Sequence, residues 1–236
     1  VRQCPAPAAV GFHTPNAPLA TVEMLLSPSQ PYTRPDGGEV LVEAATRANI
    51  AQGFKHWSDR AAAHDQNVAV FYFCGHGLMG ANDYLLPSDF GIINPLNPWA
   101  DAIDITETAR AMRRLVGGSL YFFIDACRQA ARDALSPGAS PPALAYVDFS
   151  KPVRGFTRLI LWATGEGEVA FGASGKTSRF CAALTEALSG YEGEEAPGSK
   201  GWMVTGEMLA RSVRRILEAE NASIEPQRRQ LCRAGS

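Results

Sequence analysis

The sequence predicts an α/β protein, a three-layer α/β/α sandwich around a mainly parallel sheet. Three runs, Val68–Phe73, Leu120–Ile124 and Arg158–Ala163, are almost wholly apolar, which is typical of strands buried on both faces. Segments with helical periodicity lie between and after these runs. Parallel neighbours need crossover connections, and right-handed crossovers place helices on both faces of the sheet.

The composition agrees with one folded domain. The chain has 236 residues, of which 46% are hydrophobic and 19% are charged, so it has ample apolar material for a core. The formal net charge is −2, and Lys and Arg are spread along the chain. This pattern argues against nucleic acid or a membrane surface as a partner, so we expect substrate recognition to be local.

The five cysteines are odd in number, far apart and without a C-x-x-C pair. They indicate neither a disulfide framework nor a zinc site, and we expect a cytoplasmic protein without metal or cofactor. No apolar run is long enough to span a bilayer, and the start, Val1–Pro5, lacks a signal-peptide pattern.

The other elements follow in chain order. Residues 1–20 read as an irregular segment rich in proline, and residues 21–236 as the domain. Thr21–Leu26 is a strand candidate. The apolar spacing of three and four over Glu39–His64 predicts an amphipathic helix. Further helices are expected over Thr106–Val116, with Thr106 as N-cap, over Ser178–Leu188 and over Val204–Glu220.

Residues 129–155 form a long segment between the second and third apolar runs. It contains Ser136-Pro137-Gly138 and Ser140-Pro141-Pro142, which predict a mobile loop. Loops of this length usually carry function or disorder.

Two polar motifs follow neighbouring apolar runs, where ligands bind in sheets of this kind. His76 follows the first run and Cys127 follows the second. A nucleophilic cysteine needs a nearby base to supply thiolate, so the pair predicts a catalytic dyad. The backbone N–H groups of Gly77 and Cys127 are candidate donors to an oxyanion. Taken singly, a histidine after a strand or a buried cysteine is more often structural.

The two motifs together resemble the caspase and metacaspase superfamily of cysteine peptidases. The signatures are Phe73-Cys74-Gly75-His76-Gly77 and Asp125-Ala126-Cys127-Arg128, each after an apolar strand, with the histidine about 50 residues before the cysteine as in caspases. Tyr84–Asp89 and the segment from Leu161 to Phe180 are similar to later parts of the family, and the resemblance covers residues 21–220. It implies a caspase-like sheet acting on protein or peptide substrates.

The chain departs from the family pattern in two places. The family's sheet normally begins with another strand and helix, and residues 1–20 show no such strand pattern, so we expect the first strand to be missing from this chain. At the cysteine, caspases read Gln-Ala-Cys, whereas this chain has Asp125, as metacaspases do by resemblance.

Asp125 lies two residues before Cys127 and so points to the same side of the strand. Its carboxylate would suit a cationic P1 residue, which predicts cleavage after Arg or Lys. The alternative is that Asp125 caps a helix or accepts hydrogen bonds from loop amides. Glu166 and Glu168, after the third strand, are further candidates for the pocket.

The long loop after Cys127 suggests regulation by cleavage. Arg132 and Arg154 are candidate processing sites for the enzyme itself or for an upstream protease, which would make the chain a zymogen. By resemblance, prokaryotic members of the superfamily are often implicated in defence or regulated cell death. Some metacaspases depend on calcium, but the acidic residues of this chain do not by themselves indicate a calcium site.

The same residues allow other interpretations. Asp83 and Asp89, which could orient the imidazole or bind a cation, fit ordinary turn chemistry. Cys74 is a poorer nucleophile candidate than Cys127. A catalytically silent caspase-like scaffold that binds a protein partner is the main alternative. A serine esterase is disfavoured because no G-x-S-x-G occurs, and nucleotide hydrolysis because the phosphate-loop spacing around Gly172–Thr177 fails.

Overall fold

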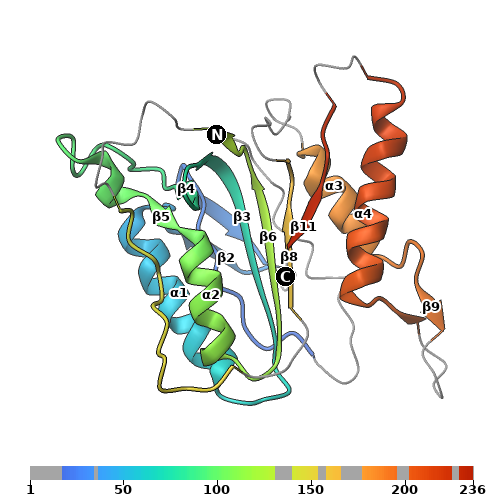
Figure 1. Cartoon of the computed structure of the whole chain (residues 1–236), viewed down its shortest axis with the longest axis horizontal. Helices are drawn as coiled ribbons and strands as arrows, with labels where there is room; N and C mark the ends of the chain where they lie inside the picture. Colours follow the sequence, from blue (N-terminus) through green and yellow to red (C-terminus); the bar gives the residue numbers. More distant parts are fainter. Residues whose placement is uncertain are drawn as a thin grey trace.

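A six-strand path with one additional short strand forms the central sheet (Figure 1). The computed structural model describes residues 18–34, 37–130, 140–153, 158–165, 177–195, 202–224 and 229–235. Strands β3 (Val68–Met79), β6 (Ser119–Ala126) and β8 (Arg158–Trp162) lie parallel to one another, as the three apolar runs predicted. The order across the path is β11-β8-β6-β3-β4-β5.

The edges of the sheet are antiparallel. Strand β11 (Arg233–Gly235) pairs with β8, and β4 (Asp83–Leu86) turns back on the end of β3 and pairs with β5 (Ile103–Asp104). A short strand, β7 (Gln129–Ala130), pairs in parallel with the end of β3. The sequence did not indicate these short strands, because two to four residues are too few to show a period.

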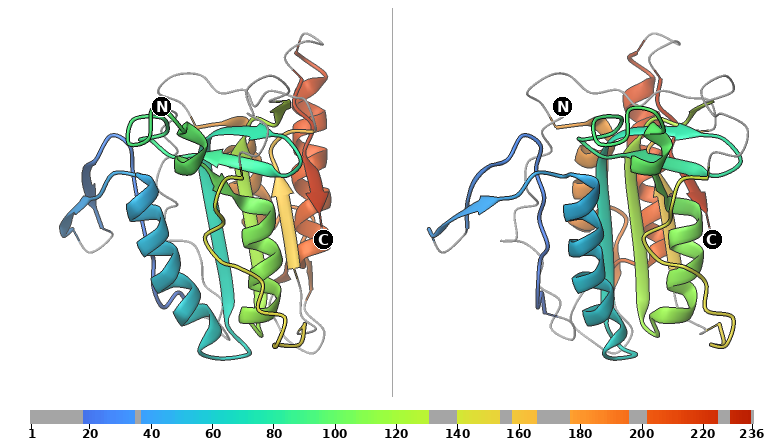
Figure 2. Two further views of the ribbon diagram at one scale, coloured as in Figure 1. Left: turned by 60° about the vertical axis from the view of Figure 1, so that its left-hand side comes forward. Right: turned by 90° about the vertical axis from the view of Figure 1, so that its left-hand side faces the viewer.

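Helices cover both faces, so the α/β/α prediction is confirmed (Figure 2). Helices α1 (Arg47–Ala62) and α2 (Ile105–Leu115) lie on one face, over a core that includes Phe54, Met112 and Phe122. Helices α3 (Arg179–Leu188) and α4 (Gly206–Asn221) lie on the other face, over a second core. We call these the α2 face and the α3 face.

The helix starts depend on polar caps. Ser178 caps α3 and Thr205 caps α4, close to the predicted boundaries. Helix α2 begins one residue earlier than predicted, because the Asp104 carboxylate accepts the hydrogen bond from the backbone N–H of Glu107. Thr106 is therefore not the N-cap, and its hydroxyl accepts from the backbone N–H of Asp83 instead.

The prediction of a strand at Thr21–Leu26 is wrong. These residues have no regular secondary structure; Leu25 packs against the core of the α2 face, and the Leu26 N–H donates to Glu43 O. A hairpin of β1 (Gln30–Thr33) and β2 (Glu39–Val42) follows as a separate two-stranded sheet.

The predicted helix over Glu39–His64 begins too early. Its first residues form β2, and α1 starts only after Thr46, whose side chain accepts from the backbone N–H of Asn49. The spacing of Val40 and Ala44 matched a helical period by chance, and the capping residue decides the true start.

Strand β3 is longer than predicted. It continues from Val68 through His76 to Met79, because β4 and β7 pair with its last residues. Among the described strands, β6 alone pairs with the first part of β3, Val68–Gly75. Residues 1–17 lie outside the described part, so the expectation that this chain lacks the family's first strand stays a prediction.

The segment predicted as a mobile loop is described in part. Residues 140–153 run along the α2 face, where Ala143 bridges to Asp104 and the Leu144 N–H donates to the Thr108 hydroxyl. Residues 131–139 and 154–157 lie outside the described part. The remaining described elements are a 3-10 turn at Pro98–Asp101 and the β9–β10 hairpin, Glu194–Glu195 with Trp202–Met203.

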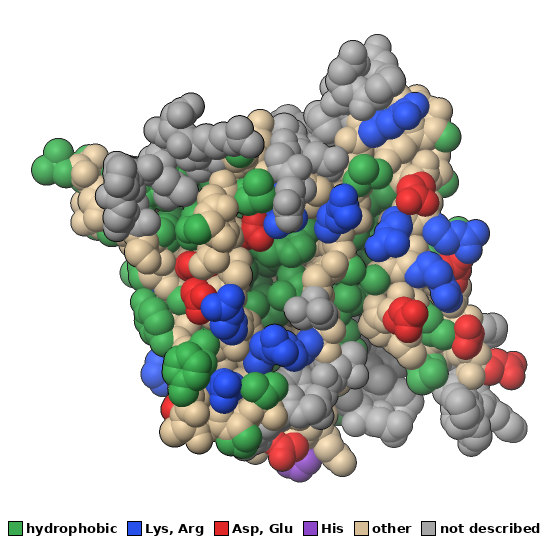
Figure 3. All heavy atoms as spheres, viewed as in Figure 1, with side chains coloured by type: hydrophobic (Ala, Val, Ile, Leu, Met, Phe, Trp, Pro, Cys, Tyr) green, Lys and Arg blue, Asp and Glu red, His purple; other side chains and the backbone are tan. Residues whose placement is uncertain are grey.

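The surface of the α4 side carries many charges. Figure 3 shows Lys and Arg side chains over α4 with acidic side chains among them. Arg211, Arg214 and Arg215 are exposed there, and Glu192 forms ion pairs with Arg211 and Arg215. In the described part of the chain no helix has the length and hydropathy to cross a membrane.

Candidate active site

His76 and Cys127 are placed by the register of one ladder. Every parallel pair between β3 and β6 joins a β3 residue to the residue 51 positions later, from Val68 with Ser119 to Gly75 with Ala126. The pairs between β3 and β7 keep the same offset, from Leu78 with Gln129 onward. Two residues, Cys127 and Arg128, separate β6 from β7. The unbroken offset therefore puts Cys127 opposite His76.

Both side chains of the dyad point to the α3 face. Cys127 and Tyr72 pack against the core of that face, and His76 shares the side of Tyr72 because side chains alternate along a strand. His76 is exposed and Cys127 is half-buried, so solvent reaches the pair. Neighbouring strands lie about 4.8 Å apart, which brings an imidazole and a thiol within mutual reach.

Gly77 is needed for the strands to approach at this point. A Cβ at residue 77 would lie 2.7 Å from the carbonyl oxygen of Cys127, 3.0 Å from Cβ of Ala126 and 3.2 Å from the carbonyl oxygen of Tyr84. Two of these atoms belong to the backbone and cannot swing away. The absence of a side chain thus keeps β3 tight against the residue that carries the nucleophile.

Asp125 lies beneath the dyad on the α3 face and is fully buried. Its Oδ2 accepts hydrogen bonds from the Tyr72 hydroxyl at 3.2 Å and from the Ser178 hydroxyl. Ser178 Oγ also accepts from the backbone N–H of Cys181 as the N-cap of α3. Asp125 therefore joins β6 to β3 and, through Ser178, to the start of α3. These contacts are close to the alternative interpretation, in which Asp125 caps a helix. No pattern in the sequence predicts Tyr72 or Ser178 as partners of Asp125.

Arg128 forms a second polar contact, on the α2 face. Its Nε and Nη2 donate to Oδ1 and Oδ2 of Asp83, both at 2.9 Å. The guanidinium carbon lies 4.8 Å from the ring centroid of Trp162, which belongs to the core of the α2 face. Asp83, predicted as a turn residue, is thus the partner of the residue that follows the candidate nucleophile.

The other candidate residues are placed as follows. Asp89 accepts from the backbone N–H of Arg47 at the start of α1, and Cys74 lies opposite Asp125 in the ladder. Four candidates lie outside the described residues: the pocket acids Glu166 and Glu168 and the processing sites Arg132 and Arg154. Within the described ranges, no group of three or more His, Cys, Asp or Glu could hold a metal ion.

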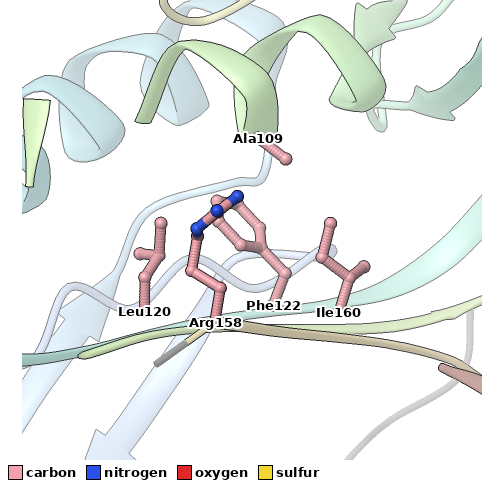
Figure 4. Close-up of a pocket in the computed structure, with 5 residues that line it drawn as sticks. All are labelled: Ala109, Leu120, Phe122, Arg158 and Ile160. Atoms are coloured by element: carbon pink, nitrogen blue, oxygen red, sulfur yellow. The ribbon is translucent and has the colours of Figure 1, made fainter. Parts of the chain in front are cut away.

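Two cavities in the described part of the chain lie away from the candidate dyad. One lies on the α2 face, where Arg158 projects from β8 toward α2 beside Leu120, Phe122 and Ile160, below Ala109 (Figure 4). A more open one lies between α4 and the β8–β11 edge. Neither is lined by His76 or Cys127. Residues 166–176, which follow β8 in the chain, lie outside the described part, so these cavities do not locate the substrate.

The arrangement supplies a thiol, an adjacent imidazole and backbone amides where two strands part. A thiol beside a base can act as a nucleophile toward a carbonyl carbon, and backbone N–H groups can bind the resulting oxyanion. These are the groups that acyl transfer to a cysteine requires.

Comparison with known proteins identifies the family of this chain. Residues 33–233 match the model of the caspase domain, a peptidase family. The uncharacterized protein y4kE of Sinorhizobium fredii is 31% identical over 208 residues, which are 88% of this chain and 60% of that protein, so the chain spans about three fifths of this relative. The crystal structure of caspase-1 from Spodoptera frugiperda matches with a TM-score of 0.47 and 20% identity, over 85% of this chain and 71% of that one. Because the family model covers most of its length, this chain belongs to the caspase-domain family of cysteine peptidases.

Proposed function

We propose that this protein is a cysteine endopeptidase in which His76 and Cys127 form the catalytic dyad. The observation that carries the proposal is the constant offset of the ladder, which aligns the imidazole and the thiol across β3 and the break between β6 and β7. Their common orientation toward the α3 face and the exposure of His76 support it.

The reaction then proceeds by acyl transfer. His76 takes the proton of the Cys127 thiol, and the thiolate attacks the scissile carbonyl carbon. Backbone N–H groups of Gly77 and Cys127 stabilise the oxyanion of the tetrahedral intermediate. His76 gives the proton to the leaving amine, which departs as the thioester forms. Water, deprotonated by His76, attacks the thioester and releases the acid and the thiol.

We assign the preference for Arg or Lys at P1 to Asp125. Its carboxylate lies two residues before the nucleophile on the same face, and no part of it is exposed. Its contacts with the Tyr72 and Ser178 hydroxyls would hold the carboxylate in place while a cationic side chain approaches. Glu166 and Glu168 are additional candidates for this pocket.

A panel of fluorogenic peptides with Arg, Lys or Asp at P1 tests both assignments. Wild-type protein should cleave the Arg and Lys peptides and leave the Asp peptide intact. Cys127→Ala should abolish turnover with the fold retained, as judged by circular dichroism, and Asp125→Ala should lower Arg hydrolysis by at least about 100-fold. An active Cys127→Ala variant would overturn the dyad, and an unchanged Arg preference in Asp125→Ala would overturn the pocket. A folded wild type that cleaves no peptide would favour the scaffold alternative.

Activation by cleavage is a second part of the proposal. An enzyme that accepts Arg can cut the segment after the nucleophile at Arg132 or Arg154, as can an upstream protease, and a defence or cell-death role would suit such a zymogen. Intact-mass spectrometry should find wild-type protein cut after one of these arginines and Cys127→Ala uncut if the enzyme processes itself. An intact chain in fully active enzyme would contradict this prediction.

A further inference from the structure

We propose that Arg128 is a positioning residue that keeps Cys127 aligned with His76, through a fixed contact with Asp83 and Trp162. The inference rests on the proposed dyad and adds to it a reason why the thiol stays in register. It concerns side chains on the α2 face, the side of the sheet away from the thiol.

The contact is well suited to fixing a backbone. Both oxygens of Asp83 accept from the guanidinium at 2.9 Å, the planar two-bond arrangement that an arginine and a carboxylate form. The side chains are 11% and 12% exposed, so water competes little for either partner. The Trp162 ring covers the guanidinium at 4.8 Å, so the group is held from a third direction.

Each partner of Arg128 is itself anchored in the sheet. Asp83 pairs with Met79 at the end of β3, and its backbone N–H donates to Thr106 in the first turn of α2. Trp162 pairs with Ile124 at the end of β8 and is 8% exposed. Arg128 therefore connects β4, which pairs with the end of β3 beyond His76, to β8 on the far side of β6.

The place of Arg128 in the chain explains why this connection matters. Cys127 and Arg128 are the two residues between β6 and β7, where the strand pairing along β3 is interrupted. The side chains on either side of this gap point opposite ways: Cys127 packs on the α3 face and Arg128 on the α2 face. Arg128 thus holds the backbone from behind while the thiol faces the substrate, and it does not touch the reacting atoms.

The test measures how strongly the reactivity of Cys127 depends on His76. Iodoacetamide is the probe, and mass mapping of the alkylated peptide gives the rate at Cys127 at near-neutral pH. The rate is compared with and without His76→Ala, in wild type and in Arg128→Gln and Asp83→Asn backgrounds. Peptide hydrolysis by the same proteins gives kcat and KM separately.

Glu192→Gln is the matched control. Glu192 is 18% exposed and also pairs with two arginines, Arg211 and Arg215, but it lies near β9, at the opposite end of the sheet from the dyad (Figure 1). Glu192→Gln thus removes a partly buried ion pair, as Asp83→Asn does, but at a place away from the strands that carry the dyad.

In wild type, His76→Ala should slow alkylation at least about tenfold, and in Arg128→Gln or Asp83→Asn the same change should have little further effect. Both variants should lose about 100-fold in kcat with KM unchanged, because a small displacement of a catalytic group is that costly. Arg128→Lys keeps the charge but not the planar fork, so it should recover only part of kcat. Glu192→Gln should behave as wild type.

The outcomes separate the two proposals. Full His76 dependence of alkylation in folded Arg128→Gln, or an equal loss in Glu192→Gln, would overturn the positioning role and leave the dyad intact. Absence of His76 dependence in wild type, together with absence of hydrolysis, would overturn the proposed function itself. If Arg128→Gln does not fold, Arg128→Lys and Asp83→Asn decide: unchanged kcat in both would refute the role.

Discussion

At the scale of single residues, small side chains matter as much as reactive ones. The dyad is aligned by backbone pairing, and that pairing requires Gly77 at the point where β3 passes Cys127. The requirement is steric, since Gly77 is in a strand and its backbone conformation is not left-handed.

Gly77→Ala should therefore damage both stability and activity. Its Cβ would meet the carbonyl oxygen of Cys127 at 2.7 Å, so β3 and the Cys127 backbone must move apart. Overpacking of this kind costs about 1–3 kcal/mol, and kcat should fall because the thiol moves with its backbone. Urea denaturation and peptide hydrolysis provide the two measurements.

Gly53→Ala is the matched control for this change. Gly53 lies inside α1, where a new Cβ would contact only Leu25 Cδ1, at 4.0 Å. Alanine there should stabilise the protein by up to about 1 kcal/mol, since glycine is a poor helix former. If Gly77→Ala were as stable and as active as Gly53→Ala, the close approach would be unimportant.

The sequence indicated the candidate site residues more clearly than the side chains that contact them. His76, Cys127 and Asp125 follow apolar runs and match a family pattern, so their positions could be predicted. Asp83 and Trp162 pair with Arg128 across strands that are distant in the chain, and single-sequence patterns carry no information on such pairs. The roles of Glu166, Glu168, Arg132 and Arg154 stay predictions.

At the scale of elements, helix caps link the site to the scaffold. The Ser178 hydroxyl has two tasks, because it caps α3 and donates to the buried carboxylate of Asp125. Thr205 only caps its helix, α4, where its hydroxyl accepts the hydrogen bond from the backbone N–H of Met208.

Ser178→Ala should thus cost more than Thr205→Ala. The loss of a cap costs about 1 kcal/mol in either helix, and Ser178→Ala also removes a hydrogen bond to a fully buried carboxylate, worth about 1–3 kcal/mol more. Chemical denaturation of the two variants gives the difference. Equal losses would show that Asp125 gains nothing from Ser178.

Predictions of elements succeeded where burial or a helix cap left a clear local signal and failed where a few apolar residues fitted more than one period. The three apolar strands and the ends of α3 and α4 agree with the sequence because burial and caps both leave a local signal. The start of α1 and the strand expected at Thr21–Leu26 did not. In these two segments a few apolar residues fit two periods equally well. The conformation is determined instead by hydrogen bonds, such as that from Leu26 N–H to Glu43 O.

At the scale of the whole molecule, two cores enclose the sheet, and they isolate one thiol from water. Cys232, just before β11, is 5% exposed and packs with α3 and α4, and burial raises its pKa to about 12. The unfolded chain releases the same proton near its ordinary value of about 8.5.

The protein should lose stability at alkaline pH because of Cys232. The folded state keeps the proton that the unfolded state gives up, so this contribution is complete below about pH 8.5 and declines as pH rises toward 12. Between about pH 9 and 10 the free energy of unfolding should fall by up to about 1.4 kcal/mol per pH unit more in wild type than in Cys232→Ala. Equal slopes in urea titrations would contradict the prediction.

The constant offset of the ladder also has a consequence for insertions and deletions. A residue lost from the connection between β3 and β6 changes the numbering of the partners but not which strand positions face each other. A residue lost from within β6 would turn the side chain of Cys127 to the face where Arg128 now lies, because a slip of one position exchanges the two sides of a strand. Length variation among relatives should therefore be tolerated in the connections and excluded from the strands. The proposed dyad depends on a lateral alignment between strands rather than on a spacing along the chain.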